Sequence, residues 1–133
     1  MIRFESSLWH CWTQLTDASR SGRPVRHANM YQENPIETET FINAMDSLVK
    51  ARGDVELMAE AFDWNNATEL LDVGSGPATY PISLCRKFSH LRATIFDLPA
   101  TITLTDRYIR EAGLSSRIQL ITGDYRADNI PGS

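Results

Sequence analysis

The residues best suited to hold a ligand lie where a short apolar run meets a Gly-x-Gly turn, in Asp72-Val73-Gly74-Ser75-Gly76. The two glycines let the backbone turn tightly and let a ligand lie against the main chain without meeting a Cβ atom. Asp97 ends the next apolar run about 20 residues beyond the second glycine, where an acidic residue of a nucleotide site bonds ribose hydroxyls. Asp124 follows a third apolar run. These residues predict a crevice that binds a nucleoside.

A parallel sheet is needed to bring these side chains together. Apolar β-type runs cover three segments, residues 69–73, 92–97 and 118–122. Helical patterns fill the intervals, starting near Tyr80 with Pro81 inside the first turn, and then from Thr101 to Ala112. The order β-α-β-α-β predicts an α/β fold, a partial Rossmann-like sheet whose strand carboxyl ends all open on the same side.

The chain divides near residue 67, because the apolar period changes there from helical to strand-like. Before that point we expect a three-helix segment. Its helices are predicted over about 6–20, 36–51 and 54–62, with a loop over 21–35. Ser6 or Ser7 is the expected N-cap of the first helix. The predicted domains are therefore residues 1–66 and 67–133.

The turn fits one nucleoside cofactor better than another. A dinucleotide fingerprint requires Gly or Ala at the sixth position from Gly74, and Thr79 stands there. A pyrophosphate also repels a nearby carboxylate, yet Asp72 lies two residues before Gly74. An acid at this position suits a ligand with a cationic part. S-adenosylmethionine carries an ammonium and a sulfonium and is favoured, while an NAD-binding Rossmann domain remains an alternative.

Residues 70–125 resemble the cofactor half of a class I S-adenosylmethionine-dependent methyltransferase. Within that class the chain resembles the O-methyltransferase family of the caffeic-acid, acetylserotonin and hydroxyneurosporene enzymes. Four stretches carry the likeness, which spans roughly residues 8–131: Leu71-Asp72-Val73-Gly74-Ser75-Gly76, Phe96-Asp97-Leu98-Pro99, Gly123-Asp124 and Phe41-Ile42-Asn43-Ala44-Met45. The resemblance implies methyl transfer to a hydroxyl of a small, aromatic molecule, with S-adenosyl-L-homocysteine as the product.

The resemblance also implies roles at the methionine end of the cofactor. Asp72, Gly74, Ser75 and Gly76 would bind the methionine part. Met45, on a helix leading into the cofactor domain, would line the methyl-transfer pocket. Residues 1–66 would supply the linker, the dimerisation region and the substrate side, and residues 67–133 the first half of the cofactor-binding domain.

At the adenosine end, the resemblance assigns four further residues. Asp97 would bind the ribose hydroxyls, and Leu98 would lie against the adenine. Asp124 would accept a hydrogen bond from the adenine amino group, with Tyr125 packing on the ring.

The sequence departs from the family in two ways. Ala78 stands where a third glycine is usual, a mild change if its only effect is one added methyl group. Family members are also much longer and carry a catalytic histidine downstream, whereas no histidine follows His90 here. The general base is therefore unknown. The chain resembles a truncated or split enzyme with little turnover alone, or else a non-catalytic cofactor-binding or oligomerisation module.

Composition excludes several other functions. Lys and Arg total 13 against 17 Asp and Glu, a net charge of −4, so an electrostatic grip on nucleic acid is not expected. No apolar run approaches the roughly 20 residues of a membrane span, and residues 1–5 are not expected to begin a signal peptide. Cys11 and Cys85 are expected to be reduced thiols of a cytoplasmic protein, and no metal site is indicated.

The unpaired edge of the first strand is expected to be covered. The cover would be a second copy in a homodimer, a missing C-terminal half or the N-terminal helices.

Overall fold

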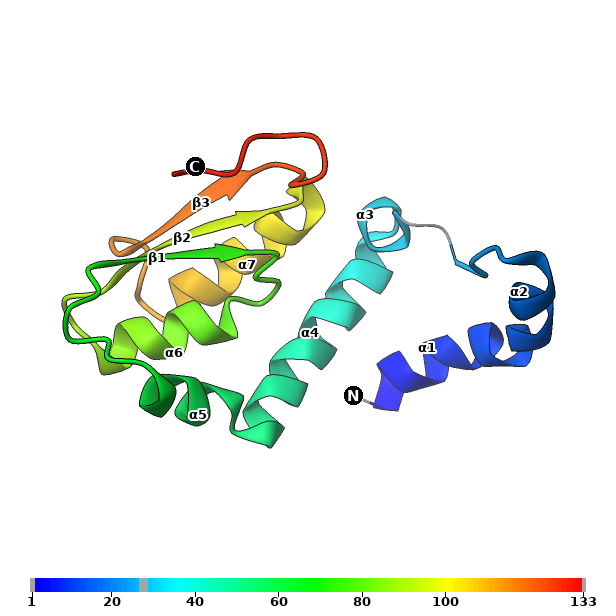
Figure 1. Cartoon of the computed structure of the whole chain (residues 1–133), viewed down its shortest axis with the longest axis horizontal. Coiled ribbons are helices and arrows are strands. Elements are labelled where there is room, and N and C mark those ends of the chain that lie inside the picture. Colours follow the sequence, from blue (N-terminus) through cyan, green and yellow to red (C-terminus); the bar gives the residue numbers. More distant parts are fainter. Residues whose placement is uncertain (1, 27–28, 133) are drawn as a thin grey trace.

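A three-stranded parallel sheet forms the centre of the C-terminal part of the chain (Figure 1). The computed structural model describes residues 2–26 and 29–132. The strands are β1 (Glu69–Val73), β2 (Arg92–Asp97) and β3 (Ile118–Thr122), in the order β1-β2-β3. Both pairings are parallel, so the three strand carboxyl ends lie on one side. The predicted strands and their common direction are confirmed.

Two helices cover one face of this sheet, α6 (Thr79–Lys87) and α7 (Pro99–Glu111) (Figure 1). The core lies between them and the sheet and is made of apolar side chains, among them Leu84, Cys85, Ala93, Ile95, Ile109 and Ile118. Pro81 is the third residue of α6, inside the first turn as predicted. Helix α7 begins two residues earlier than expected, because Pro99 suits its first position.

The opposite face of the sheet is only partly covered. Leu71 and Val73 remain 40% and 38% exposed. A hollow of about 410 Å³ lies on this face, with Ile121 and the C-terminal Pro131 among its lining residues. Within the described residues β1 pairs only with β2, so its outer edge has no strand partner. What covers that edge stays a prediction.

The N-terminal segment contains more helices than predicted. They are α1 (Ile2–Thr13), α2 (Leu15–Ser21), α3 (Met30–Glu33), α4 (Pro35–Arg52) and α5 (Asp54–Ala61).

Three expectations for this segment are wrong. The single helix over 6–20 is divided at Gln14, whose N–H donates to the carbonyl of Cys11, three residues back, and so tightens the turn. Helix α1 also begins at Ile2, so neither Ser6 nor Ser7 is its N-cap. In addition, the predicted loop over 21–35 contains the one-turn helix α3.

Helix α4 connects the N-terminal helices to the sheet domain (Figure 1). It starts where Asn34 Oδ1 accepts from the N–H groups of Ile36 and Glu37, at 3.1 and 3.4 Å, and it ends at Gly53. Hydrogen bonds from Arg107 to Glu39, at 2.8 Å, and from Tyr108 to Asn43 fix it against α7.

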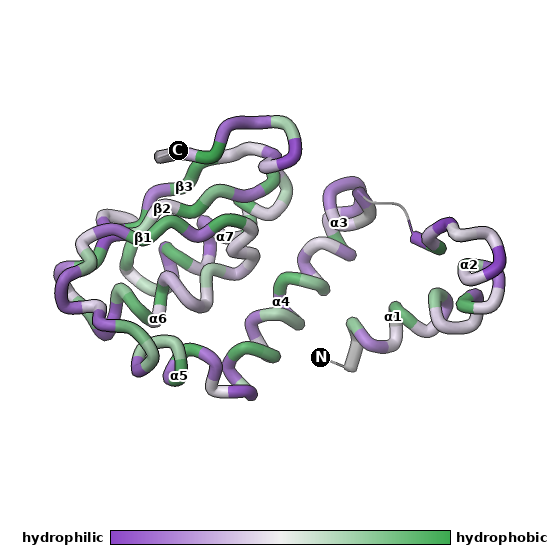
Figure 2. The backbone as a smooth tube through the Cα atoms, viewed as in Figure 1, coloured by the Kyte–Doolittle hydropathy of each residue, from purple (hydrophilic) through white to green (hydrophobic). Residues whose placement is uncertain are grey.

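Hydrophobic residues concentrate in the strands, whereas α2 and the chain that follows it are mainly hydrophilic (Figure 2). Trp64 is buried in the hydrophobic core, while Trp9 and Trp12 on α1 are 71% and 63% exposed. In the part of the chain that the structure describes, no helix combines the length and the apolar character needed to cross a bilayer.

Candidate functional site

The turn after β1 folds back onto the end of β2. Gly74 has a φ of +76° and donates its N–H to the carbonyl of Phe96 at 2.9 Å. Gly76, with a φ of +60°, donates its N–H to Asp97 Oδ2 at 2.8 Å. A Cβ atom added at Gly74 would meet no protein atom within 4 Å, so space lies beside it. The two glycines are needed for their backbone conformation.

Asp97 is the last residue of β2 and contacts the Gly-x-Gly turn. It is 9% exposed, and its Oδ1 accepts from the N–H of Leu98 at 2.7 Å while Oδ2 binds Gly76. Burial raises the pKa of the Asp97 carboxyl, although these two N–H groups act to lower it. Each carboxylate oxygen keeps a second lone pair, which a ligand hydroxyl could use.

Asp72 is the last residue but one of the neighbouring strand β1, close enough to Asp97 for the two charges to interact. Its Oδ2 accepts from Ser75 Oγ at 2.7 Å. Burial raises the pKa of Asp72, the hydrogen bond from Ser75 opposes that rise, and the charge of Asp97 adds to it. No ion pair joins either carboxylate to a cation among the described residues. Two carboxylates without counter-ions favour a ligand that brings its own positive charge.

Ala78 has a left-handed backbone, with a φ of +59°. It is fully buried and precedes the first residue of α6. For a residue with a Cβ atom this conformation costs about 1–2 kcal/mol. Ala78, in place of the glycine that is usual at this position in the resembled family, therefore has a cost in backbone conformation as well as one added methyl group.

Asp124 and Tyr125 lie beyond β3, at the third strand end. Both carboxylate oxygens of Asp124 accept from the Arg126 guanidinium, with Oδ2 2.7 Å from Nη2. These bonds lower the pKa of Asp124 to about 2. Tyr125 is 63% exposed. A ligand amino group at Asp124 would thus share the carboxylate with Arg126, a partner that sequence reasoning missed.

Helix α4 lies against the Gly-x-Gly turn. The Ile42 side chain would be 3.5 Å from a Cβ atom placed on Gly76. Asp46 Oδ1 accepts from Thr79 Oγ1 at 2.8 Å, which ties α4 to the start of α6. Met45, between these contacts in the sequence, is half-buried. The structure thus brings the helix of Met45 to the turn.

Thr105 is a supporting residue that sequence reasoning missed. It is fully buried on α7, and its Oγ1 lies 2.6 Å from the carbonyl oxygen of Gly76 and 2.9 Å from that of Thr101. The sequence does contain a signal for this role. Thr101 and Thr105 are four residues apart, on a helix face that otherwise packs on the core. Polar residues at core positions of a helix indicate a specific hydrogen-bond partner.

Gly123 is required because Phe96 occupies the space of a side chain. A Cβ atom there would lie 2.3 Å from Phe96 Cε2. We expect Gly123→Ala to lower the free energy of unfolding by roughly 1–3 kcal/mol, measured by urea denaturation. The double variant Gly123→Ala, Phe96→Leu should recover part of the loss, because the smaller side chain removes the collision. An unchanged urea midpoint in the single variant would contradict this reading.

Metal-ion binding and cysteine chemistry are the other possibilities that the residue types raise. Among the described residues, no group of three or more His, Cys, Asp or Glu side chains could hold a metal ion. Cys85 is buried and Cys11 half-buried, and both are free thiols.

Comparisons with known proteins show what the chain is similar to. A family model described as the O-methyltransferase domain matches residues 12–133. The L-tyrosine C(3)-methyltransferase of Streptomyces lavendulae is 35% identical over 111 residues, which are 84% of this chain and 29% of that protein. The 3-hydroxy-5-methyl-1-naphthoate 3-O-methyltransferase of Streptomyces sahachiroi is 31% identical over 127 residues, 90% of this chain and 35% of that protein.

A solved structure shows the same fold. It is an O-methyltransferase from neocarzinostatin biosynthesis in complex with S-adenosylmethionine and 2-hydroxy-5-methyl naphthoic acid. It superposes with a TM-score of 0.79 over 92% of this chain and 39% of that chain, at 23% identity. The chain thus spans about a third of the length of the curated relatives that it matches.

Proposed function

Because the chain belongs to the O-methyltransferase domain family, we propose that it binds S-adenosyl-L-methionine and serves methyl transfer to a hydroxyl of a small, aromatic acceptor. The observation that carries the proposal is the pairing of a bare Gly-x-Gly backbone with two carboxylates, Asp72 and Asp97, at adjacent strand ends. Neither carboxylate has an ion-pair partner among the described residues, and both have raised pKa values. A cationic nucleoside would relieve that cost.

The turn would bind the methionine end of the cofactor. Asp72 supplies the negative charge that an ammonium or sulfonium group needs. Ser75 keeps the Asp72 carboxylate in place through its 2.7 Å hydrogen bond. Gly74 and Gly76 let the ligand approach the main chain, and Met45 would line the methyl pocket from α4.

The adenosine end would lie along the ends of β2 and β3. Asp97 would accept from the ribose hydroxyls with the lone pairs left free by Gly76 and Leu98, and the Leu98 side chain would contact the adenine. Asp124 would accept from the adenine amino group beside Arg126, and the exposed ring of Tyr125 would pack on the base.

The reaction is an in-line displacement at a methyl group. When bound, S-adenosylmethionine supplies the electrophilic methyl group and leaves as S-adenosylhomocysteine. The chain contributes positioning and charge, which account for much of the rate enhancement in such transfers. A base must take the acceptor's hydroxyl proton, and no residue of this chain is assigned that role. We therefore expect cofactor binding with little turnover by the 133-residue chain alone.

The acceptor atom is the finer part of the proposal. One relative is named as an O-methyltransferase of a naphthoate and another as a C-methyltransferase of tyrosine, so related chains use aromatic acceptors through different atoms. A hydroxyl acceptor follows the family description. An NAD-binding domain is disfavoured by Asp72 and by the family match.

Titration calorimetry tests the cofactor proposal. S-adenosylhomocysteine should bind with one-to-one stoichiometry and raise the melting temperature, because a ligand that binds only the folded state stabilises it. NAD at the same concentration serves as the control and should do neither. A chain that binds NAD and ignores S-adenosylhomocysteine would exclude the methyltransferase proposal.

The wider organisation is proposed as well. Residues 1–66 would form the linker, dimerisation and substrate-side region, and residues 67–133 part of the cofactor domain. A second copy or a C-terminal partner half would cover the unpaired edge of β1 in a cytoplasmic protein. The exposed Trp9 and Trp12 on α1 support a contact with another chain. Light scattering at micromolar concentration should give a dimer mass, and a monomer would contradict the homodimer.

A further inference from the structure

Helix α7, which begins directly after the Asp97–Leu98 segment, receives its N-terminal cap from a distant side chain. Leu98 occupies the N-cap position and has no side-chain oxygen with which to accept. Gln32 supplies one from α3, since its Oε1 accepts from the N–H of Ala100 at 3.2 Å. Gln32 Nε2 also donates to Thr101 Oγ1 at 3.2 Å. A residue 68 positions earlier thus does what a local cap normally does.

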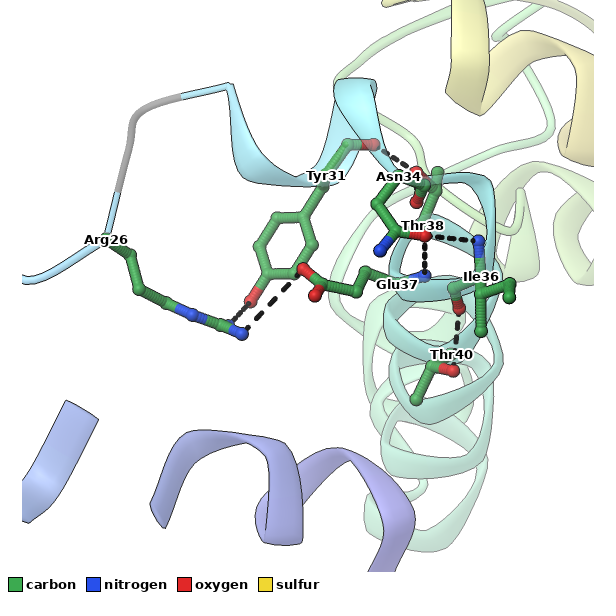
Figure 3. Close-up of polar contacts among 7 residues, drawn as sticks. All are labelled: Arg26, Tyr31, Asn34, Ile36, Glu37, Thr38 and Thr40. Atoms are coloured by element: carbon green, nitrogen blue, oxygen red, sulfur yellow. Dashed lines mark hydrogen bonds and ion pairs between the residues drawn. The ribbon is translucent and has the colours of Figure 1, made fainter. Parts of the chain in front are cut away.

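Tyr31, the neighbour of Gln32 in the sequence, is held by contacts with α4 and with Arg26 (Figure 3). The Tyr31 carbonyl accepts from Thr38 Oγ1 on α4, and Thr38 is buried. The Tyr31 ring stacks on Phe41, with ring centroids 4.1 Å apart and planes at 13°. Arg26 adds a contact with the Tyr31 hydroxyl at 3.4 Å. The one-turn helix α3 is therefore held on α4 from several directions and presents Gln32 to α7.

The first turns of α7 are hydrogen-bonded to the Gly-x-Gly turn and to the end of β2. Thr105 Oγ1 has one proton to share between the carbonyl oxygens of Gly76 and Thr101. Gly76 in turn donates to Asp97, and Asp97 accepts from Leu98 at the start of α7. A shift of the first turn of α7 would therefore move Asp97 relative to the Gly-x-Gly turn.

We infer that Gln32 is a positioning residue for the ligand crevice, which fixes the Asp97–Leu98 segment by capping helix α7. Its contribution to ligand affinity rests on the proposed function, whereas its effect on the order of the crevice does not. Helix α3, although only four residues long, would thus hold the side chain that caps α7.

Three variants separate this role from a general contribution to stability. Gln32→Leu removes both hydrogen bonds. Gln32→Glu keeps an acceptor for Ala100 and can accept from the Thr101 hydroxyl, so it should rescue. Glu39→Gln is the matched control, because it weakens the exposed 2.8 Å pair with Arg107, another link between the N-terminal region and α7 that does not reach the crevice.

Amide hydrogen exchange of the ligand-free chain is the first measurement. We expect Gln32→Leu to speed exchange about tenfold at Ala100 and at Gly76, with Gln32→Glu and Glu39→Gln close to wild type. Gln32→Ser, which is too short to reach α7, should behave like Gln32→Leu if the leucine variant folds poorly. An unchanged exchange rate at Gly76 in both Gln32→Leu and Gln32→Ser would overturn the inference.

The dissociation constant for S-adenosylhomocysteine is the second measurement, taken at a temperature where every variant is fully folded. Gln32→Leu should weaken binding about five- to tenfold, and 5′-methylthioadenosine, which keeps only the nucleoside end, should lose the same factor. A merely structural role would lower the melting temperature and leave both constants unchanged, which overturns the inference. If the wild-type chain binds neither compound, the proposed function fails, and the exchange data still decide the role of Gln32.

Discussion

Replacing Asp97 with alanine is expected to weaken binding of S-adenosylhomocysteine by about 1–3 kcal/mol, roughly 5- to 150-fold. The reason is the loss of charge-assisted hydrogen bonds from the ribose hydroxyls to a carboxylate residue that is only 9% exposed. The same variant should also unfold more easily, because the N–H groups of Gly76 and Leu98 lose their acceptor.

The conservative variant Asp97→Asn separates these two effects. Its amide oxygen can still accept from one of the two N–H groups, so the free energy of unfolding should fall less than in Asp97→Ala, while the affinity loss persists. Asp106→Asn, which removes an exposed carboxylate from the same region, is the control and should bind like wild type. Titration calorimetry measures the affinities, and a wild-type affinity in Asp97→Ala would remove Asp97 from the site.

Replacing Asp72 with asparagine should have opposite effects on stability and on binding. Affinity for S-adenosylhomocysteine should fall about 10- to 100-fold, because the ligand's ammonium loses its counter-charge. The melting temperature of the ligand-free chain at neutral pH should rise, because the variant no longer buries a carboxylate without a cationic partner. The 2.7 Å bond from Ser75 can persist, since the amide oxygen also accepts.

The gain in stability should depend on pH in a defined direction. The folded-state pKa of Asp72 lies above its ordinary value of 3.8, first because of burial and then because of the charge of Asp97. A carboxyl with a raised folded pKa stabilises the fold while protonated, and that contribution is lost as pH rises above 3.8 through the folded pKa. The advantage of Asp72→Asn should thus appear at neutral pH and vanish in acid. An equal gain in melting temperature at neutral pH and in acid would contradict the role of Asp72 ionisation.

Much of the sheet domain could be predicted from the sequence, because its patterns are local. The three apolar runs are bounded by turn residues, so each strand begins and ends at the predicted residue. Parallel pairing then places Asp72 and Asp97 at neighbouring strand ends without further information. The physical reason is that strand order and direction follow from the alternation with helices.

The N-terminal region was predicted less well, because its boundaries depend on contacts between distant residues. Helix α3 has only four residues, too short for a periodic pattern, and it is held by Tyr31 on Phe41 and by Thr38. The division at Gln14 leaves the apolar period of α1 and α2 almost unbroken, so periodicity alone predicts one helix.

The residues that support the candidate site through hydrogen bonds were not predicted from the sequence either. Gln32, Asp46 and Thr105 come from three helices and hold the starts of α6 and α7 and the Gly-x-Gly turn, and their partners lie 29 to 69 residues away in the sequence. Hydrogen bonds over such separations have no sequence period. Ala78 shows a related limit, since its identity suggests a small difference, whereas its φ of +59° reveals a backbone cost.

The common direction of the three strands has a practical consequence for attaching reporters. Ser115 and Ser116 are exposed beside the amino ends of β1 and β2, together with Glu69 and Arg92, at the rim farthest from the crevice. A fluorophore or a surface tether coupled through Ser115→Cys, in a chain that also carries Cys11→Ser, would leave the proposed cofactor site facing the solvent. Immobilised kinetics could then be recorded without modifying the residues under test.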